Sequence, residues 1–517
     1  MPASKLTIDG QNLSISDVAG VAKDARQVLL AKKARERVVK SHNWVSDIVA
    51  KGKPVYGINT GFGIFADKNI SPEDIQTLNR NLILSHAVGT GPELEAEVVR
   101  AAMLIRANTL AAGFSGARPE LIENLLAMLN AGLHPSIPSQ GSLGSSGDLA
   151  PLSHLALVLS TDQADREAES GWAQFESQRM SGKKAMKSAN IPRLILGPKE
   201  GLAITNGATF SAALATLTLS LAKSLLNVAE VSAAMSLEAL LGASAALDKR
   251  LHTARRQTGQ MQVAARLRAL TAGSRLLDAA GRVQDAYSLR CAPQVQGPAR
   301  DTLTFVSQIV GQEINAATDN PLLFGPDETI SGGNFHGEPI GMAMDFLKIA
   351  LSEVAAISER RTYHLTDGKM NAGLPPMLVS SQEAAGLNSG LMMLQYTAAA
   401  LVLENQALAS PDSVLSLPTS GGKEDHNANA MSAARKAWQI AHNTAHVLAI
   451  ELFCATYALD LRMRALPDRK PGIGIRKAHK TIKEKINMQD KDSLWGPEIE
   501  QVREMLFQGQ LDLGEFF

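Results

Sequence analysis

The chain has 517 residues, 45% of them hydrophobic, which is enough for a large buried core and for more than one domain. Lys and Arg total 51 and Asp and Glu total 51, so the formal net charge is zero, and the composition does not favour nucleic acid or an anionic membrane as a partner. We therefore expect a small-molecule partner. Two cysteines, Cys291 and Cys454, are too few for a disulfide framework and indicate a reducing compartment.

Neither the N-terminus nor the longest uncharged run indicates export or membrane insertion. Residues 1–10 are polar and lack the basic start, apolar run and cleavage site of a secretory signal, so we expect a cytoplasmic protein. The run 386–403 approaches the length of a membrane span but contains Asn388, Ser389 and Gln395. We interpret this run as a buried helix of a bundle.

The first 200 residues combine short helical stretches with two glycine-rich segments, 57–63 and 141–147. We expect the region 1–200 to be a smaller N-terminal region of short helices and loops. Loops held by a rigid scaffold often carry catalytic groups, so the two glycine-rich segments are the first places to look for chemistry.

The segment from Gly141 to Asp148 allows two interpretations. Its glycines permit backbone conformations that side chains exclude, and Asp148 is well placed to cap the helix that follows. The first interpretation is an ordinary capped helix start, because Ser-Gly turns are common. The second is a backbone bent so tightly that the Gly147 nitrogen can attack the Ser145 carbonyl.

Long stretches rich in Ala, Leu, Met, Glu, Lys and Gln dominate the second half of the chain and are typical of helices. The helix that starts at Met431 has apolar residues in steps of three and four and ends before Pro467. The predicted fold class is mainly α, with a long-helix bundle core at 201–470 and a C-terminal helical segment at 471–517. The other long helices are expected at about 209–247, 341–364 and 380–408.

Seven segments of the chain resemble, in the same order, signature segments of the aromatic amino acid ammonia-lyase family, and within it the histidine ammonia-lyases. One such match would be weak, whereas seven in order leave little room for accident. They are residues 56–63, 141–151, 200–206, 284–294, 318–321, 331–336 and 424–426.

The resemblance implies that the triplet Ser145-Ser146-Gly147 cyclises and loses water to form 4-methylidene-imidazol-5-one (MIO), and that no metal or nucleotide cofactor is used. Relatives usually have Ala where this chain has Ser145. Because the ring takes only the backbone carbonyl of Ser145, we expect this substitution to be tolerated. The β-hydrogen of the substrate is barely acidic and its amine leaves poorly, so elimination needs an electrophile.

The resemblance also assigns roles around this group. It makes Tyr56 the base that removes the β-proton, and since a phenol has a pKa of about 10, the site would have to lower that value. Arg290 resembles the arginine that binds the substrate carboxylate, for which a planar guanidinium is suited. The polar residues around the MIO group and the substrate amine are Asn206, Gln284 and Tyr287, and the aromatic residue beside the group is Phe335.

Two positions resemble those that select histidine over phenylalanine. His86 follows Ser85, and a phenyl ring would leave the polar edge of His86 without a partner. The Glu424 carboxylate can accept a hydrogen bond from an imidazole or act on a proton. Lys423 stands where relatives usually have Gln; if it points inward it can pair with Glu424, and if it points to solvent nothing changes.

We therefore predict that the protein eliminates ammonia from L-histidine to give trans-urocanate. By resemblance it is a homotetramer whose active sites are shared between subunits. The alternatives are a lyase or 2,3-aminomutase for phenylalanine or tyrosine, and a catalytically silent helical oligomer. His442 and His446 have a spacing that can bind metal, but no acidic base lies between them, so we expect no metal site.

Overall fold

The computed structural model describes residues 5–52, 54–381 and 383–513. The chain forms two compact units, each built from non-consecutive segments. Unit 1 comprises residues 1–220, 307–345 and 411–435, and unit 2 comprises residues 221–306, 346–410 and 436–517.

The predicted regions were consecutive, whereas the units interleave along the sequence. The reason is that four long helices contribute residues to both units, so the chain leaves unit 1 and returns to it twice. The outer ends of the first and last predicted regions, residues 1–4 and 514–517, lie outside the described residues. The four helices are α9 (Thr209–Ala239), α13 (Ala292–Glu313), α14 (Glu338–Thr366) and α16 (Ala430–Ala465).

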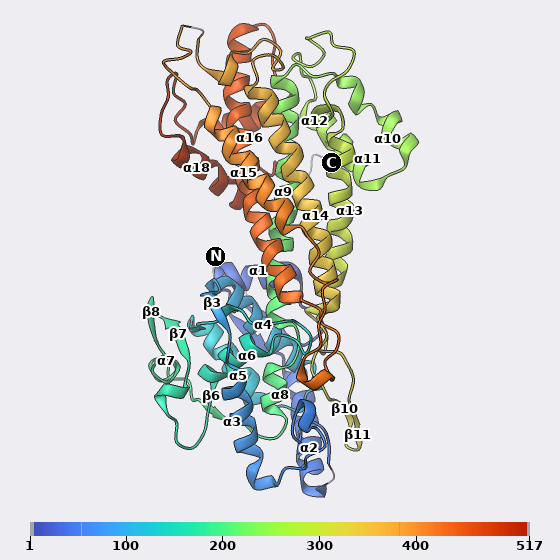
Figure 1. The fold of residues 1–517 in the computed structure, drawn as a ribbon, viewed down its shortest axis with the longest axis vertical. Coiled ribbons are helices and arrows are strands. Elements are labelled where there is room, and N and C mark those ends of the chain that lie inside the picture. Colours follow the sequence, from blue (N-terminus) through green and yellow to red (C-terminus); the bar gives the residue numbers. More distant parts are fainter. Residues whose placement is uncertain (1–4, 53, 382, 514–517) are drawn as a thin grey trace. The chain divides into compact units, whose positions relative to one another are not determined.

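Unit 1 consists largely of short helices around one buried helix (Figure 1). Every residue of α4 from Val98 to Ala111 is buried, and α4 packs against α1, α2 and α5. The helices of this unit are α1 (Ile15–Asp24), α2 (Lys32–Lys51), α3 (Ile75–His86), α4 (Ala96–Ala111), α5 (Pro119–Ala131), α6 (Leu149–Leu159), α7 (Gly182–Ser188) and α8 (Glu200–Thr205).

The strands of unit 1 are short and form small separate sheets. β1 (Leu6–Ile8) pairs in parallel with β2 (Val28–Leu30), and β6 (Ser160–Thr161) with β9 (Leu194–Ile195). The antiparallel pairs are β3 (Thr90–Glu93) with β5 (Pro138–Gln140), β4 (His134–Pro135) with β7 (Trp172–Phe175), β7 with β8 (Gln178–Ser181), and β10 (Leu322–Gly325) with β11 (Glu328–Ile330). The 3₁₀ turns are η1 (Gly63–Phe65), η2 (Pro72–Asp74), η3 (Glu167–Glu169) and η6 (Ser420–Gly422).

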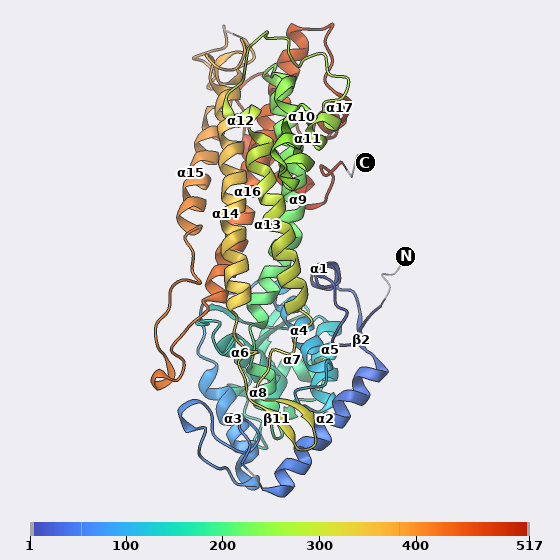
Figure 2. The same ribbon diagram turned by 90° about the vertical axis from the view of Figure 1, so that its right-hand side faces the viewer.

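Unit 2 is a bundle in which α9, α13, α14 and α16 lie alongside one another in both views (Figures 1 and 2). Positions 434, 441, 445, 448, 452, 455 and 459 of the apolar stripe expected on α16 are fully buried, whereas Trp438 of the same stripe is only partly buried. The mainly α fold class is therefore confirmed. The other elements of unit 2 are η4 (Ser244–Leu247), α10 (Lys249–Arg255), α11 (Thr258–Leu270), α12 (Tyr287–Arg290), η5 (Pro376–Leu378), α15 (Met392–Leu408), α17 (Ile473–Lys483) and α18 (Trp495–Phe507).

Helix α15 differs from its prediction in length and in burial. It begins at Met392 rather than near 380, because Gly386 and Gly390 adopt φ values of +90° and +61° that an α-helix cannot contain. It was expected to be buried, but Tyr396 and Leu403 are 59% and 66% exposed, so one face of α15 is an exposed apolar surface.

Two helices, α9 and α16, are long and apolar enough by composition to cross a membrane. However, 78% and 83% of their most apolar windows are buried inside the protein. Core helices of large bundles have the same composition, because they are covered by protein on every side.

Candidate active site

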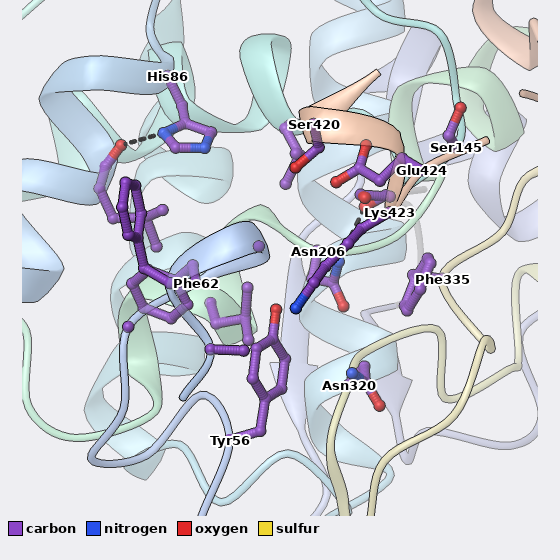
Figure 3. A pocket seen from close by; sticks show the side chains of 18 of the residues that line it. Tyr56, Phe62, His86, Ser145, Asn206, Asn320, Phe335, Ser420, Lys423 and Glu424 are labelled. Atoms are coloured by element: carbon purple, nitrogen blue, oxygen red, sulfur yellow. Dashed lines mark hydrogen bonds between the residues drawn. The ribbon is translucent and has the colours of Figure 1, made fainter. Parts of the chain in front are cut away.

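A pocket of about 1190 Å³ in unit 1 brings together seven of the predicted site residues. Its walls come from the loop before η1, the end of α3, the loop before α6, the end of α8, the loop before α14 and the loop around η6 (Figure 3). The seven residues are Tyr56, His86, Ser145, Ser146, Asn206, Phe335 and Glu424.

The triplet is held by hydrogen bonds from segments far away in the sequence. The Ser146 carbonyl accepts hydrogen bonds from the Asn206 side chain at 2.8 Å and from the Gly207 backbone N–H at 3.3 Å. The Ser145 hydroxyl accepts one from the Asn427 amide at 2.9 Å, and Ser145 is buried. The backbone of the triplet is therefore fixed before any reaction, with the partly exposed Ser146 lining the pocket.

The backbones of Gly147 and Gly207 lie so close together that no side chain fits between them. Gly147 has φ +81°, and a Cβ placed on it would lie 2.1 Å from the Gly207 carbonyl carbon. The two residues form an isolated parallel bridge, and the Asp148 N–H donates to the Gly207 carbonyl at 2.9 Å. This contact explains why the segment needs glycine, while ring closure between the Gly147 nitrogen and the Ser145 carbonyl stays a prediction.

The Asp148 side chain caps a different helix from the one expected. Asp148 stands at the N-cap position of α6, but its carboxylate makes no capping bond there. Instead it accepts hydrogen bonds from the Ser211 N–H at 2.7 Å, the Ser211 hydroxyl at 3.0 Å and the Ser142 hydroxyl at 2.7 Å. The capping prediction is therefore wrong for α6: Asp148 ties the triplet loop to the first turn of α9.

The residues present fit an MIO group. The triplet has no side chain at Gly147 to obstruct ring closure, and the Ser146 side chain lines the pocket where a substrate would lie. The Asn206 side-chain oxygen is buried without a hydrogen-bond partner in the described part of the chain. An unsatisfied acceptor at this position is a group available to a ligand or to a substrate amine.

Within one subunit, the surroundings of Tyr56 disfavour the ionised phenol that the predicted base needs. Burial raises the pKa of the Tyr56 phenol, the negative charges of Glu424 and Asp319 raise it further, and a hydrogen bond from the Gly63 backbone only partly offsets them. The groups of this subunit therefore do not meet the requirement that the site lower the pKa of Tyr56. The hydroxyl of Tyr56 points into the pocket (Figure 3).

His86 is oriented by its own helix. Its Nδ1 lies 2.9 Å from the Leu82 carbonyl oxygen and 3.0 Å from the Ser85 hydroxyl (Figure 3). A carbonyl can only accept, so Nδ1 carries the proton, and in a neutral ring Nε2 is then a free acceptor. His86 therefore presents a hydrogen-bond acceptor to the pocket.

Glu424 and Lys423 lie on the loop around η6 but are not an ion pair. The Thr419 N–H donates to the Glu424 carbonyl, and the Glu424 N–H donates to the Thr419 carbonyl. The Thr419 hydroxyl lies 3.4 Å from the Glu424 carboxylate. Lys423 points inward and lines the pocket, with its side chain running toward the Tyr56 hydroxyl in Figure 3. In the described part of the chain, no ion pair joins Lys423 to Glu424.

Two asparagines in and behind the pocket had no role assigned from sequence. Asn427 holds Ser145, and Asn320 lines the pocket while bonding Ser331 and the Gly332 N–H. Asn320 lies within the matched segment 318–321, which was a signal for it. Asn427 had no such signal, because its partner is 282 residues away in the sequence.

Three predicted site residues, Gln284, Tyr287 and Arg290, belong to unit 2 and do not line this pocket. Tyr287 is 71% exposed, and the Arg290 guanidinium carbon lies 4.8 Å from the centre of its ring. The Arg290 Nε is buried without a hydrogen-bond partner in the described residues. These residues thus form a separate polar and aromatic surface on and beside α12.

The two histidines with metal-like spacing have other contacts. His446 Nε2 lies 2.9 Å from the Glu500 carboxylate, and the His442 ring packs against Trp438 at 4.4 Å between centres. Within residues 5–52, 54–381 and 383–513, no three His, Cys, Asp or Glu side chains are placed to hold a metal ion.

Comparison with known proteins gives consistent matches over nearly the full chain. The family model described as aromatic amino acid lyase matches residues 13–484. A histidine ammonia-lyase of Caldanaerobacter subterraneus subsp. tengcongensis is 48% identical over 486 residues, covering 93% of this chain and 92% of the relative. The structure of histidine ammonia-lyase from Trypanosoma cruzi is 34% identical with a TM-score of 0.89, over 98% of this chain and 94% of that one. The tyrosine aminomutase of Streptomyces globisporus is 32% identical with a TM-score of 0.90, over 98% of each chain.

Proposed function

The chain belongs to the aromatic amino acid lyase family, and on that premise we propose that it eliminates ammonia from L-histidine to give trans-urocanate. The observation that carries this proposal is the pocket that combines the bent triplet, Tyr56 and a hydrogen-bond acceptor at His86. The alternative within the family is a lyase or aminomutase for tyrosine or phenylalanine, which the structural likeness to tyrosine aminomutase keeps open.

The triplet and its neighbours would provide the electrophile and its support. When formed, an MIO group supplies an electrophile that makes the substrate amine a better leaving group. Asn206 and Gly207 would hold the carbonyl of residue 146 through the hydrogen bonds that they already make. Phe335 would close one side of the pocket against water.

Tyr56 would take the β-proton on its phenol oxygen. Because its pKa is raised within the subunit, the neutral phenol predominates at neutral pH, and positive groups must stabilise the ionised form. Lys423 is one such group in the pocket. Arg290 from another subunit would be a second, while also binding the substrate carboxylate through paired hydrogen bonds.

An assembly in which subunits share active sites explains both the exposed α12 residues and the exposed apolar surfaces of unit 2. Phe305 on α13 and Phe346 on α14 are exposed and lie ring to ring at 5.8 Å between centres. The exposed face of α15 adds Tyr396 and Leu403. We propose a cytoplasmic homotetramer that covers these surfaces and brings Gln284, Tyr287 and Arg290 to the pocket of another subunit.

Intact-mass spectrometry tests the prosthetic group. The wild-type polypeptide is expected to be lighter than its sequence by the mass of two waters. Ser146→Ala is expected to have the unmodified mass, because the hydroxyl that is lost in dehydration is absent. Ser145→Ala is the matched control and should mature like wild type, since only the backbone of residue 145 enters the ring. A wild-type chain of full mass that is fully active would contradict the proposal.

Substrate comparison tests the preference for histidine. The acceptor Nε2 of His86 and the Glu424 carboxylate can both bind imidazole N–H groups, which a phenyl ring lacks. In His86→Phe and Glu424→Gln, kcat/KM for histidine is expected to fall about tenfold or more, and by more than kcat/KM for phenylalanine. Lys423→Gln is the control and should keep the preference, because Lys423 does not pair with Glu424.

Product analysis of the same assays separates the alternatives. A wild-type preference for tyrosine or phenylalanine, or the appearance of a β-amino acid instead of a conjugated acid and ammonia, would replace histidine elimination as the function. If none of the three amino acids is turned over, the remaining alternative is a catalytically silent helical oligomer.

A further inference from the structure

A second pocket, of about 550 Å³, lies entirely within unit 2 and has no part in the proposed elimination. It is formed by α9, α10, α11 and α13, which are neighbours at one side of the bundle (Figures 1 and 2). We call it the basic pocket because five of its lining residues are cations and one is a carboxylate: Lys223, Lys249, Arg266, Arg268, Arg300 and Glu230.

Buried Glu230 holds two of the arginines in place. Its carboxylate accepts a hydrogen bond from Arg300 Nε at 2.5 Å and lies 2.9 Å from Arg266 Nε. Arg300 also donates to the Asn227 side chain at 2.8 Å, and Arg266 is only 7% exposed. Glu230 is thus shared between two guanidinium groups, and Arg266 Nη2 also lies 3.5 Å from the Asp512 carboxylate, so the two arginines form a rigid wall whose charge is largely balanced by carboxylates.

Three further cations face the pocket from three different helices. Lys223 on α9 and Lys249 at the start of α10 are exposed, and Arg268 on α11 uses one nitrogen to donate to the Leu247 carbonyl at 2.6 Å. In the described part of the chain, none of these three forms an ion pair. Like charges gathered around one cavity repel one another, and an anion in the cavity removes that cost.

The rest of the lining is neutral and partly apolar. His252 is buried, and burial lowers its pKa, so it is neutral at pH 7. Its Nδ1 accepts from the Gln260 amide at 2.8 Å, and its Nε2 lies 3.1 Å from the Ala246 carbonyl. Met261 and Ala265 provide apolar surface next to the lysine and arginine stems.

We propose that the basic pocket binds a small phosphorylated molecule with an aromatic ring, such as a nucleoside diphosphate. The lysines and arginines match the charge of phosphate, and Met261 and Ala265 match a ring. The volume exceeds that of a phosphate ion and lies within the range of ordinary ligand pockets, about 300–1,000 Å³. The site is independent of the proposed elimination and of the residues that carry it.

Calorimetric titration of the full-length protein with ADP, inorganic phosphate and adenosine tests the proposal. ADP is expected to bind with a dissociation constant below about 1 mM, phosphate more weakly, and adenosine not measurably. Lys223→Gln with Lys249→Gln should weaken ADP binding about tenfold or more, and Arg268→Gln should act in the same direction. The thermal midpoint of the wild type should rise with ADP, and that of the double variant should not.

Lys477→Gln is the matched control, because Lys477 is an exposed lysine of α17 in the same unit and outside the basic pocket. It should bind ADP like wild type. The double variant should keep ammonia-lyase activity, which shows that it is folded. The proposal is overturned if ADP does not bind, if phosphate or adenosine binds as tightly as ADP, or if the double variant and Lys477→Gln bind ADP equally.

Discussion

Gly207→Ala is expected to yield a folded chain that stays unmodified and has below about a thousandth of wild-type activity, because it lacks its electrophile. Gly207 has φ +111°, and an added Cβ would lie 2.5 Å from the Thr318 hydroxyl and 2.7 Å from Arg106 Nη2. Both neighbours are buried, so Gly207 must shift. The shift breaks its hydrogen bonds to the Ser146 carbonyl and from the Asp148 N–H, which hold the bend of the triplet.

Intact mass and histidine elimination are the two measurements for this variant. Gly132→Ala is its matched control, because Gly132 also has a positive φ of +73° but nothing lies within 4 Å of its Cβ position. Gly132→Ala should lose some stability from backbone strain alone and should mature normally. A Gly207→Ala protein that has lost two waters and turns over histidine would show that the close approach to Gly147 is dispensable.

Arg290→Ala is expected to keep the mass of the mature protein but to lose kcat/KM for histidine by several hundredfold or more. The physical reason is that removing one partner of a buried ion pair costs roughly 3–5 kcal/mol. Arg290→Lys should recover little, because an ammonium cannot make paired hydrogen bonds to a carboxylate. Near-normal kinetics in Arg290→Ala would remove this residue from the site.

Mixing two inactive variants tests whether Arg290 acts on another subunit's pocket. An Arg290→Ala subunit retains Ser146, and a Ser146→Ala subunit retains Arg290. If sites are shared, equal co-expression of both variants should restore activity to about one quarter of the wild-type value. The reason is that about one quarter of the active sites then receive Ser146 from one kind of subunit and Arg290 from the other. Activity that stays at the level of the separate variants would place the complete site within one subunit.

The sequence predicted the composition of the site better than its energetics. The resemblance of ordered motifs singled out Tyr56, the triplet and Asn206, and the structure places Tyr56, Ser145, Ser146 and Asn206 around one pocket. A base at Tyr56 requires a lowered pKa, whereas burial and the charges of Glu424 and Asp319, which come from distant segments, raise the pKa of Tyr56 within the subunit. Charged residues that only folding brings close to Tyr56 cannot be predicted from the spacing of residues in a local segment.

Contacts between residues far apart in the sequence were likewise not predicted from local spacing. Asp148 was expected to cap α6, but its partner Ser211 is 63 residues further along the chain. Helix α15 was expected to be buried because its sequence is uncharged, and yet one apolar face is exposed within the subunit. An apolar stretch says that a surface avoids water, but not whether the same chain or another copy covers it.

The residues that hold the triplet by hydrogen bonds are synthesised after the triplet itself. Ser145-Ser146-Gly147 leaves the ribosome first, Asn206 and Gly207 follow, and Gly337, whose N–H donates to the Gly144 carbonyl, comes later. We therefore expect the proposed ring closure to follow the synthesis of residue 337. A chain truncated before residue 337 would carry the reactive sequence without all of its backbone supports, so a mature prosthetic group would mark a polypeptide that has been synthesised and folded beyond that residue.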